Sequence, residues 1–471
     1  MATKVRVLIL GAGPTGLLTA WALKERGISD VCIIEKTGSV GGLAKRRTAA
    51  GWHVDFGPHR FQTRDERIRA VIEQMVGAKL REVTNKRVGV WLRGSPVDYP
   101  PRLGQVIRAL PAKEVLQCGA SFIKSRLFGP RSDPAHTYEG WTIARYGNRF
   151  YQLTLAHMAR KMWAVEPPAL SEDLAIERDV LGSARGLMFG PSLSRGYRQY
   201  QERFYYPQTY FGELWERAVT QLQQSGIGVI LNAVPTSLRI ENNRVLTVTV
   251  RSNDGEREFN PHYVVSTIPL PDLVSAFGSQ LPSEAHVALE RILYRALVIV
   301  YLIMRKSKLS PFHFIYFPEP EYVFQRLFEQ KNFADQPQNS SSTVIGAEIS
   351  CFEDDSVWRS SDDELRKHVV EGLERAGLAT TSDIGDCFTA RESHAYPMYT
   401  WNYRGALDTL LDELGKLENL ILNGRQGLFK FNNIDHCVEM GLAAAHHIAT
   451  DQPPHNWQTA IRSFKQFKVI D

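Results

Sequence analysis

The chain of 471 residues carries 56 Lys and Arg against 51 Asp and Glu, which gives a formal net charge of +5. Because this charge is modest and the basic residues form no block, the composition argues against nucleic-acid binding and suits a small anionic ligand. The most apolar run, Ala296 to Met304, is too short to span a bilayer, so we expect a buried strand there and no membrane span. The length allows more than one domain.

Cysteine usage and the start of the chain bear on its location. The five cysteines are odd in number, far apart in the sequence and without metal-ligand spacing, so we expect reduced thiols and no metal site. The chain enters a strand almost at once, which predicts no signal peptide and a cytoplasmic protein. A homo-oligomer is left open. The cysteines are Cys32, Cys118, Cys351, Cys387 and Cys437.

The first elements in chain order are a strand, a helix and a second strand. An apolar run predicts a buried strand over residues 5–10, a helical pattern covers 17–26, and a second strand over 31–35 ends in an acid. Three glycines with the spacing G-x-G-x-x-G lie between the first strand and the helix. In this full context the motif predicts an α/β, Rossmann-like dinucleotide-binding domain.

Each residue of this motif has a physical role. Gly11 permits the tight turn, Gly13 lets a pyrophosphate approach the backbone, and Gly16 lets the helix lie against the sheet. The helix N-terminus offers free N–H groups and a partial positive charge to the phosphates. Glu35, at the end of the second strand, is placed to accept hydrogen bonds from a ribose.

A second pair of glycines distinguishes an FAD-binding site from an NAD-binding site. After Glu35 comes a short polar turn and then Gly41-Gly42. This order resembles the FAD-binding front end of amine oxidases, protoporphyrinogen oxidases and UDP-galactopyranose mutases, in which the second pair also approaches the cofactor. The resemblance therefore implies FAD.

The middle of the chain is expected to interrupt the cofactor domain twice. Helical patterns dominate 103–127 and 141–160 and predict a helical insertion, whereas the strand at 263–269 is of the kind that rejoins a nucleotide-binding sheet. Strands at 292–304, 314–317, 321–326 and 343–349 predict a second, antiparallel sheet. The predicted boundaries are 1–90, 204–270 and 386–450 for a discontinuous FAD-binding domain, 91–203 for a helical substrate-side insertion, 271–385 for an antiparallel-sheet substrate domain and 451–471 for a C-terminal tail.

The C-terminal part repeats the signal of the front end. A strand over 420–422 leads into a Gly-Arg turn at Gly424-Arg425 and then into a helix over 438–450. Such a turn would bring backbone N–H groups and a cation back towards the cofactor. In UDP-galactopyranose mutases a Gly-Arg…Gly-x-(Tyr/Trp)-Arg-Tyr…Asp pattern closes the FAD site at this place.

Several further stretches, in the family's order, resemble UDP-galactopyranose mutases. Gly57 to Phe61 resembles the loop at the flavin, and Lys161 to Trp163 followed by Arg178 resembles the substrate region. Ile315 to Pro318 followed by Arg326 resembles the strand pair with the second essential arginine. Tyr396-Pro397 resembles the Tyr-Pro near the diphosphate. The match touches most of the chain.

The resemblance implies a flavin-dependent nucleotide-sugar mutase. In this family the reduced FAD attacks the anomeric carbon through its N5 and expels the nucleoside diphosphate. The flavin–sugar adduct opens and recloses through another hydroxyl, which interconverts pyranose and galactofuranose-like furanose forms without net redox change. The implied partner is a nucleotide sugar, and NAD(P)H is a candidate external reductant.

The resemblance also implies roles for individual residues. Arg178 and Arg326 would stabilise the leaving diphosphate, because planar guanidinium groups suit it, and His59 would hydrogen-bond the flavin. Trp163 would stack on the substrate. The expected substrate-binding residues are Trp163, Tyr396, Phe431 and Lys430, and the expected cofactor-binding residues are Gly11, Gly13, Thr15, Gly16, Glu35, Lys36, Gly42, Leu43, Arg425 and Asn433.

Two positions depart from the family pattern. Phe431 stands where the family has a diphosphate-binding tyrosine, so one phosphate contact should be missing or replaced. Lys430 stands where the family has an arginine, and it supplies a point charge instead of a fork. Structural roles stay open as well: Arg178 follows Glu177 and could form a surface ion pair, and Arg326 could face solvent from its strand.

Two other functions remain as alternatives. An FAD-dependent oxidase or desaturase of the protoporphyrinogen oxidase or amine oxidase type would share the fold and both FAD motifs, but it would consume oxygen and need an apolar or amine site. A non-catalytic flavin-binding scaffold is the third, against which the intact glycine, histidine and arginine signals argue. A hydrolase has no support, because no Ser-His-Asp arrangement is visible.

Overall fold

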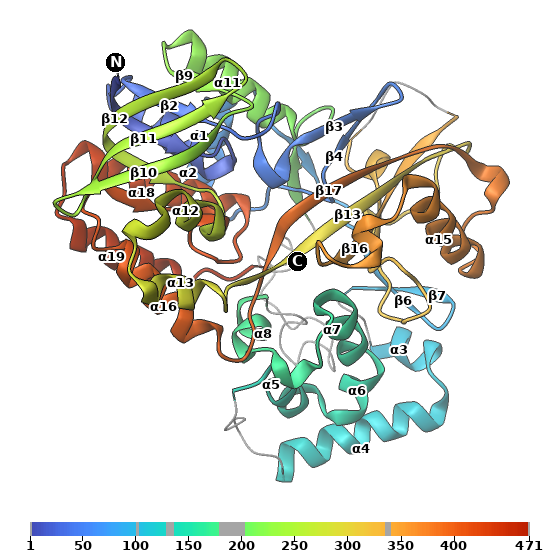
Figure 1. Ribbon diagram of the computed structural model, residues 1–471. Helices are drawn as coiled ribbons and strands as arrows, with labels where there is room; N and C mark the ends of the chain where they lie inside the picture. The colour runs from blue at the N-terminus through green and yellow to red at the C-terminus, as the bar shows by residue number, and fades with distance from the viewer. Residues whose placement is uncertain (1, 100–102, 129–135, 179–202, 335–340, 470–471) are drawn as a thin grey trace.

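The computed structural model describes residues 2–99, 103–128, 136–178, 203–334 and 341–469. Figure 1 shows three regions: one sheet with helices around it at the upper left, a second sheet at the right, and a group of helices at the bottom. The N-terminal (blue) and C-terminal (red) parts of the chain meet in the first region. The predicted mixed α/β architecture is confirmed.

The first sheet has a parallel centre and an antiparallel edge. Its strands are, in spatial order, β10 (Val234–Glu241), β11 (Arg244–Ser252), β12 (Gly255–Ser266), β1 (Thr3–Leu10), β2 (Val31–Ile34) and β9 (Gly228–Ile230), with β18 (Leu420–Leu422) also paired to β12. β12 is parallel to both β1 and β18, so strands from the two ends of the chain flank a strand from its middle. The carboxyl ends of these parallel strands meet at one edge, where ligands bind in such sheets.

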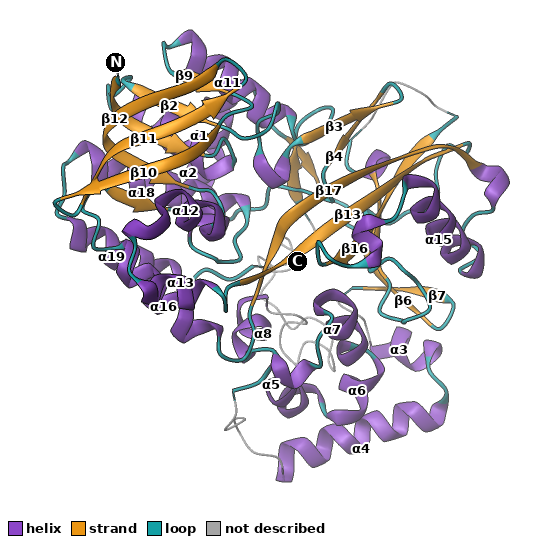
Figure 2. Ribbon diagram, viewed as in Figure 1, coloured by secondary structure: helices purple, strands orange, loops and turns teal. Residues whose placement is uncertain are grey.

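Helices surround this sheet (Figure 2). They are α1 (Pro14–Lys24), α2 (Glu66–Val76), α11 (Glu213–Gln224), α12 (Leu270–Phe277), α13 (Ser283–Leu289), α16 (Tyr403–Leu414), α17 (Gly424–Gly427), α18 (Ile434–Ala449) and α19 (Pro454–Phe464). Among residues 451–471, for which we predicted a C-terminal tail, α19 forms a helix, because Trp457, Ile461 and Phe464 give it a buried face.

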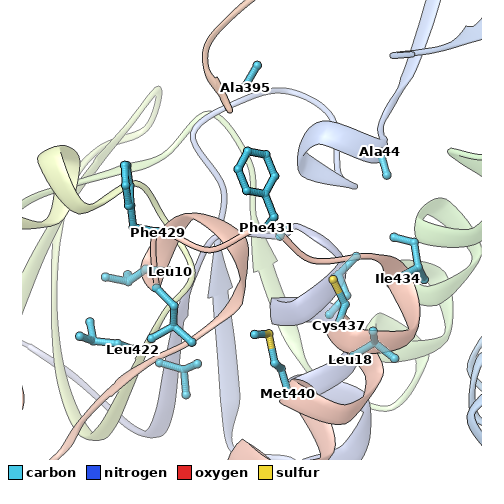
Figure 3. Packing of buried hydrophobic residues seen from close by; sticks show 14 of the residues in the cluster. Leu10, Leu18, Ala44, Ala395, Leu422, Phe429, Phe431, Ile434, Cys437 and Met440 are labelled. Carbon is cyan, nitrogen blue, oxygen red and sulfur yellow. The ribbon is translucent and has the colours of Figure 1, made fainter. Parts of the chain in front are cut away.

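The contact between α1 and α18 holds the two ends of the chain together. Figure 3 shows Leu18 beside Cys437 and Met440, below the turn that carries Phe431. A Cβ atom built on Gly441 would lie 2.8 Å from the Leu18 Cβ, so the two helices pack as closely as a glycine allows. This close packing places the N-termini of both helices at the same edge of the sheet.

The second sheet has seven strands in the order β17 (Ile384–Met398), β13 (Leu293–Met304), β16 (Thr343–Cys351), β15 (Arg326–Glu329), β14 (Phe314–Tyr316), β6 (Val88–Leu92) and β7 (Ser95–Asp98). In β13, Val298, Val300 and Leu302 face a core with α15 (Asp362–Arg375), whereas Leu297 and Ile299 face the main core. Because neighbours in a strand point to opposite faces, this continuous apolar run is buried on both sides. The prediction of a buried strand here is confirmed.

Three details of the second sheet differ from the expectations. β6 pairs with β14, although the predicted boundary between residues 90 and 91 divided β6. β17 pairs with β13, although the predicted boundaries placed most of β17 in the FAD-binding domain. The strand expected over 321–326 is wrong, because β15 begins only at Arg326. The Lys161 ammonium group donates hydrogen bonds to the carbonyl oxygens of Phe317, Glu319 and Phe324 at 2.6–3.0 Å and so holds this stretch as a turn.

The remaining elements are the helical insertion and short pieces. The insertion contains α3 (Leu103–Ala109), α4 (Ala112–Phe128), α5 (Tyr138–Tyr146), α6 (Asn148–Leu153), α7 (Leu155–Trp163) and α8 (Glu172–Arg178). The short pieces are β3 (Arg46–Ala49) with β4 (Trp52–Asp55), β5 (Arg81–Val83) with β8 (Phe204–Tyr206), and α14 (Ser356–Arg359). Within the described residues, every helix is too short or too polar to cross a bilayer.

Candidate functional site

A cavity of about 810 Å³ lies between the two sheets. It runs from the carboxyl ends of β1 and β2 to the face of the second sheet, and its wall includes residues from both ends of the chain. One end is lined by Gly11, Glu35 and Thr236, the other by Arg326, Glu348 and Tyr396. The cavity thus joins the predicted cofactor motif to the predicted substrate residues.

Glycines shape the end of the cavity at β1. Gly11 has φ +103°, which favours glycine, and a Cβ atom on Gly16 would lie 2.1 Å from the Gly11 carbonyl oxygen. Gly13 caps α1 without a side-chain hydrogen bond, so the first N–H groups of this helix are open to a ligand. A Cβ atom on Gly42 would lie 3.1 Å from the Gly13 Cα. The two glycine pairs therefore form one narrow cradle for a phosphate chain.

Glu35 is fixed beside this cradle. It is 8% exposed, its Oε2 accepts a hydrogen bond from the Ala12 N–H at 3.0 Å, and its Oε1 accepts hydrogen bonds from the Thr37 N–H at 3.0 Å and the Thr37 hydroxyl at 2.9 Å. The Oε2 atom keeps accepting capacity for a ribose hydroxyl. Thr15, Lys36 and Leu43, which we predicted to contact the cofactor, also line the cavity.

The C-terminal turn closes the opposite side of the cradle. A Cβ atom on Gly424 would lie 3.0 Å from the Thr15 hydroxyl oxygen, and Asn433 caps the N-terminus of α18 in a capping box with His436. The Arg425 Nε is buried without a hydrogen-bond partner in the structure. An orphaned buried donor and two helix N-termini around one cavity fit an anionic dinucleotide such as FAD.

His59 lies where the cradle meets the second sheet. Its Nε2 is 2.8 Å from the Leu43 carbonyl oxygen, so this nitrogen carries the proton and donates. Burial, together with the positive charges of Arg425 and Arg326, lowers the pKa of His59 to about 4. His59 is therefore a neutral hydrogen-bonding group at neutral pH.

A buried network holds the loop that carries His59. The Asp55 carboxylate accepts hydrogen bonds from the Phe211 N–H at 2.6 Å, from the Gln330 side chain at 3.1 Å and from the Tyr206 hydroxyl. The Tyr301 hydroxyl of β13 donates to the Asp55 carbonyl oxygen at 2.8 Å. Burial raises the pKa of Asp55 to about 6. The network ties the loop after β4 to β8, to the turn before α11 and to the second sheet.

Arg326 turns into the cavity and pairs with an acid that the sequence analysis did not select. Its Nε and Nη2 donate to the two oxygens of the Glu348 carboxylate, each at 2.9 Å. Arg326 is 14% and Glu348 1% exposed in their side chains, so the solvent-facing alternative is wrong. This bidentate pair fixes the plane of the guanidinium group. The one signal for Glu348 was a lone acid within the apolar run of β16.

Arg178 and the aromatic residues form the wall next to Arg326. The Arg178 guanidinium carbon lies 5.6 Å from the centre of the Phe431 ring, and that of Arg425 lies 5.4 Å from the same ring. Both Arg178 and Tyr396 line the large cavity together with Phe431. Arg178 and Arg425 thus lie against the Phe431 ring, and because Glu348 offsets the charge of Arg326, these two guanidinium groups give this end of the cavity a positive field.

Trp163 is placed differently from the expectation. It is 3% exposed and packs edge-on against Tyr396 and Phe431, with ring centres 6.4 and 6.2 Å apart. It does not line the large cavity in the described structure, but it lines a second cavity of about 120 Å³. Arg178 lines both cavities. The second one has mostly aliphatic and aromatic walls, among them Leu110, Leu153 and Met158.

Lys430 lines neither cavity. Its ammonium group lies 2.8 Å from Glu177 Oε1, and the Tyr399 hydroxyl donates to Glu177 Oε2 at 2.9 Å. Lys430 is 8% and Glu177 13% exposed in their side chains. The expected direct contact of Lys430 with the substrate is therefore wrong. Because its ammonium group forms an ion pair with Glu177, Lys430 anchors the end of α8 next to Arg178.

A second ion pair in the wall was also missed. The Lys45 ammonium group lies 3.0 Å from Glu392 Oε2, and both side chains line the large cavity. The Lys45 charge holds the pKa of Glu392 low against the effect of burial. Lys45 follows the second glycine pair by three residues, but 347 positions separate it from Glu392, so no local pattern links them.

Comparisons with known proteins agree with this geometry. A family model described as flavin containing amine oxidoreductase matches residues 14–449. The curated L-amino-acid oxidases of Sistrurus catenatus edwardsii and Crotalus adamanteus are 31% identical over 86 residues, which are 18% of this chain and 16% of those proteins. This short match covers a small part of the relatives' length.

Solved structures match nearly the whole chain. A reduced UDP-galactopyranose mutase has a TM-score of 0.83 at 19% identity, covering 98% of this chain and 99% of that one. A putative protoporphyrinogen oxidase from Exiguobacterium sp. 255-15 has a TM-score of 0.71 at 18% identity, covering 96% and 100%. A putrescine oxidase has a TM-score of 0.61 at 16% identity, again covering 96% and 100%. At these identities the likeness shows the fold.

Proposed function

We propose that this chain, which belongs to the flavin containing amine oxidoreductase family, is an FAD-dependent mutase. It would interconvert the pyranose and furanose forms of a nucleotide sugar without net redox change. One observation carries the proposal: the guanidinium groups of Arg178 and Arg326 converge on a cavity wall beyond the cofactor cradle. Such a pair suits a substrate with a diphosphate next to its reacting carbon.

The cradle supports FAD as the cofactor. Gly11, Gly13 and Gly42 would hold the pyrophosphate between the N-termini of α1 and α18, and Glu35 would hold a ribose. The buried Arg425 would pair with the negative charge of the cofactor. When bound and reduced, FAD supplies the electron pair that this isomerisation needs.

The residues of the chain would stabilise the leaving group. Negative charge develops on the diphosphate as its bond to the sugar breaks, and fixed guanidinium groups lower that barrier without reorganisation. Glu348 holds the Arg326 fork in one orientation, and Tyr396 supplies a hydroxyl in the same wall. Phe431 gives the wall an apolar face where the resembling family has a hydroxyl. His59, neutral and donating to Leu43, keeps the loop after β4 in place.

The test is an anaerobic turnover assay with chemically reduced protein and a panel of nucleoside-diphosphate hexoses. We expect Arg178→Lys and Arg326→Lys each to lower kcat/KM by at least about a hundredfold, since a point charge cannot replace a planar fork. Arg149→Lys is the matched control, because Arg149 also has a bidentate pair, with Glu114, but lies in the helical insertion away from the large cavity. Wild-type kcat/KM in either cavity variant would remove that arginine from the proposal.

A second candidate function is an FAD-dependent oxidase or desaturase. The apolar walls of the second cavity, which meets the large one at Arg178, favour it, because they would suit a hydrocarbon part of a substrate. This function predicts oxygen consumption with an apolar or amine substrate. The mutase function predicts turnover without oxygen.

A further inference from the structure

The helical insertion exposes an unusual number of apolar side chains. Nine large hydrophobic side chains are exposed among the described residues, and five of them fall within residues 107–128, on α3 and α4. Single exposed apolar residues are common on protein surfaces, but a cluster of them usually marks an interaction site. The five are Ile107 (47% exposed), Leu116 (73%), Ile123 (57%), Leu127 (69%) and Phe128 (81%).

The patch is one face of α4. Leu116, Ile123 and Leu127 are spaced seven and four residues apart, so at about 100° per residue they lie within about 40° of one another around the helix. The opposite face of α4 packs on the protein: Glu114 pairs with Arg149 at 2.6 Å, and the Ser121 hydroxyl accepts from the Arg149 N–H at 3.0 Å. The apolar row therefore points away from the molecule and is not part of its core.

The charges around this row have one sign. Arg108, Lys113, Lys124 and Arg126 are exposed on α3 and α4. The single acidic residue between positions 103 and 128 is Glu114, whose carboxylate is turned inward and paired. An apolar row flanked by cations is complementary to the acyl chains and anionic headgroups of a membrane surface.

We propose that the exposed face of α3 and α4 docks this protein onto an anionic bilayer surface. α4 would lie in the interface with Leu116, Ile123 and Leu127 inserted between headgroups, while the four cations contact lipid phosphates. Leu110, which joins α3 to α4, lines the apolar second cavity, so docking brings that cavity close to the bilayer. The proposal requires no membrane-spanning helix and holds for either candidate function.

The test is vesicle sedimentation of the flavin-loaded protein. We expect binding to vesicles of 30% phosphatidylglycerol in phosphatidylcholine, much weaker binding to phosphatidylcholine alone, and loss of binding at high salt. Ile123→Glu should weaken binding by about tenfold or more. It removes an apolar group that would insert into the bilayer, and it adds a negative charge that the anionic lipids repel. Val287→Glu on α13 is the matched control, since Val287 is also 57% exposed, and it should leave binding unchanged. Flavin absorbance shows that both variants are folded.

Three results would overturn the proposal. The first is the absence of binding to the anionic vesicles at low salt. The second is equal binding of Ile123→Glu and Val287→Glu. The third is a concentration-dependent dimer in analytical ultracentrifugation that Ile123→Glu abolishes, because a second copy of the chain would then cover this face.

Discussion

The ion pair between Lys430 and Glu177 can be tested by breaking it from one side. The Glu177 carboxylate is 13% exposed, and in Lys430→Met it keeps the hydrogen bond from the Tyr399 hydroxyl but loses its ion pair. Removing one partner of a buried pair typically costs about 3–5 kcal/mol. Since both side chains keep slight exposure, we expect Lys430→Met to lower the free energy of unfolding by about 3 kcal/mol. Urea denaturation followed by tryptophan fluorescence measures this change.

The double variant and the pH dependence make the test specific. Burial raises the pKa of Glu177, and without Lys430 it rises further, so the folded variant binds more protons than the unfolded chain. Stability of Lys430→Met therefore falls as pH rises, and its deficit is smaller at pH 5 than at pH 8. Adding Glu177→Gln removes the unpaired charge and should restore stability to within about 1 kcal/mol of wild type.

A surface pair provides the control for this prediction. Lys416 and Glu413 are 2.5 Å apart, but Lys416 is 62% exposed, so Lys416→Met should cost less than about 0.5 kcal/mol. Because Glu177 adjoins Arg178, Lys430→Met should also weaken binding of an anionic ligand, and the double variant should recover it. If Lys430→Met is as stable as wild type at pH 8, the pair does not anchor α8.

The remaining predictions concern the cradle, His59 and the turn that precedes β15. Gly16→Ala should abolish flavin retention, because its Cβ would collide with the Gly11 carbonyl oxygen, whereas Gly119→Ala on α4, with open space around it, should retain flavin; absorbance after gel filtration decides. The ring of His59, whose pKa is lowered to about 4, should show no titration between pH 5 and 8 in NMR spectra, and a midpoint near 6.5 would contradict this. Lys161→Met should cost about 2 kcal/mol in urea denaturation by leaving three carbonyl oxygens without a donor. Because the pKa of Lys161 is lowered to about 7, the folded wild type binds fewer protons than its unfolded chain, and its stability rises from pH 7 to 10. The stability lost in Lys161→Met should therefore grow over this range, and a loss that is independent of pH would refute the prediction.

The local part of the site could be predicted from the sequence. The front end is a strand, a glycine turn and a helix in direct succession, so spacing alone relates Gly11 to Gly13 and to Glu35. The Gly-Arg turn after β18 repeats the same logic at the other end of the chain. The pairing of β18 beside β12, with β1 on its other side, then brings the two turns together.

The long-range part of the site could not be predicted. Glu348 and Arg326 meet because β15 and β16 are antiparallel neighbours, and this register fixes the bidentate pair. Lys430 and Glu177 are 253 residues apart and pair through packing of α8 on the C-terminal turn. Residues 321–325 have a pattern suited to a strand, but the Lys161 ammonium group holds their neighbouring carbonyl groups in a turn. The two ion pairs depend on contacts between distant segments, and in the third case tertiary contacts override a local preference.

The most direct test of the mutase proposal is to incubate the flavin-loaded, chemically reduced protein with nucleoside-diphosphate hexoses under anaerobic conditions. The measurement is the ring form, pyranose or furanose, of the sugar in the product. The proposal predicts conversion between pyranose and furanose forms with no oxygen consumed on re-aeration beyond that needed to reoxidise the flavin. It is contradicted if no sugar nucleotide binds or is converted while an amine or an apolar substrate is turned over with stoichiometric oxygen consumption.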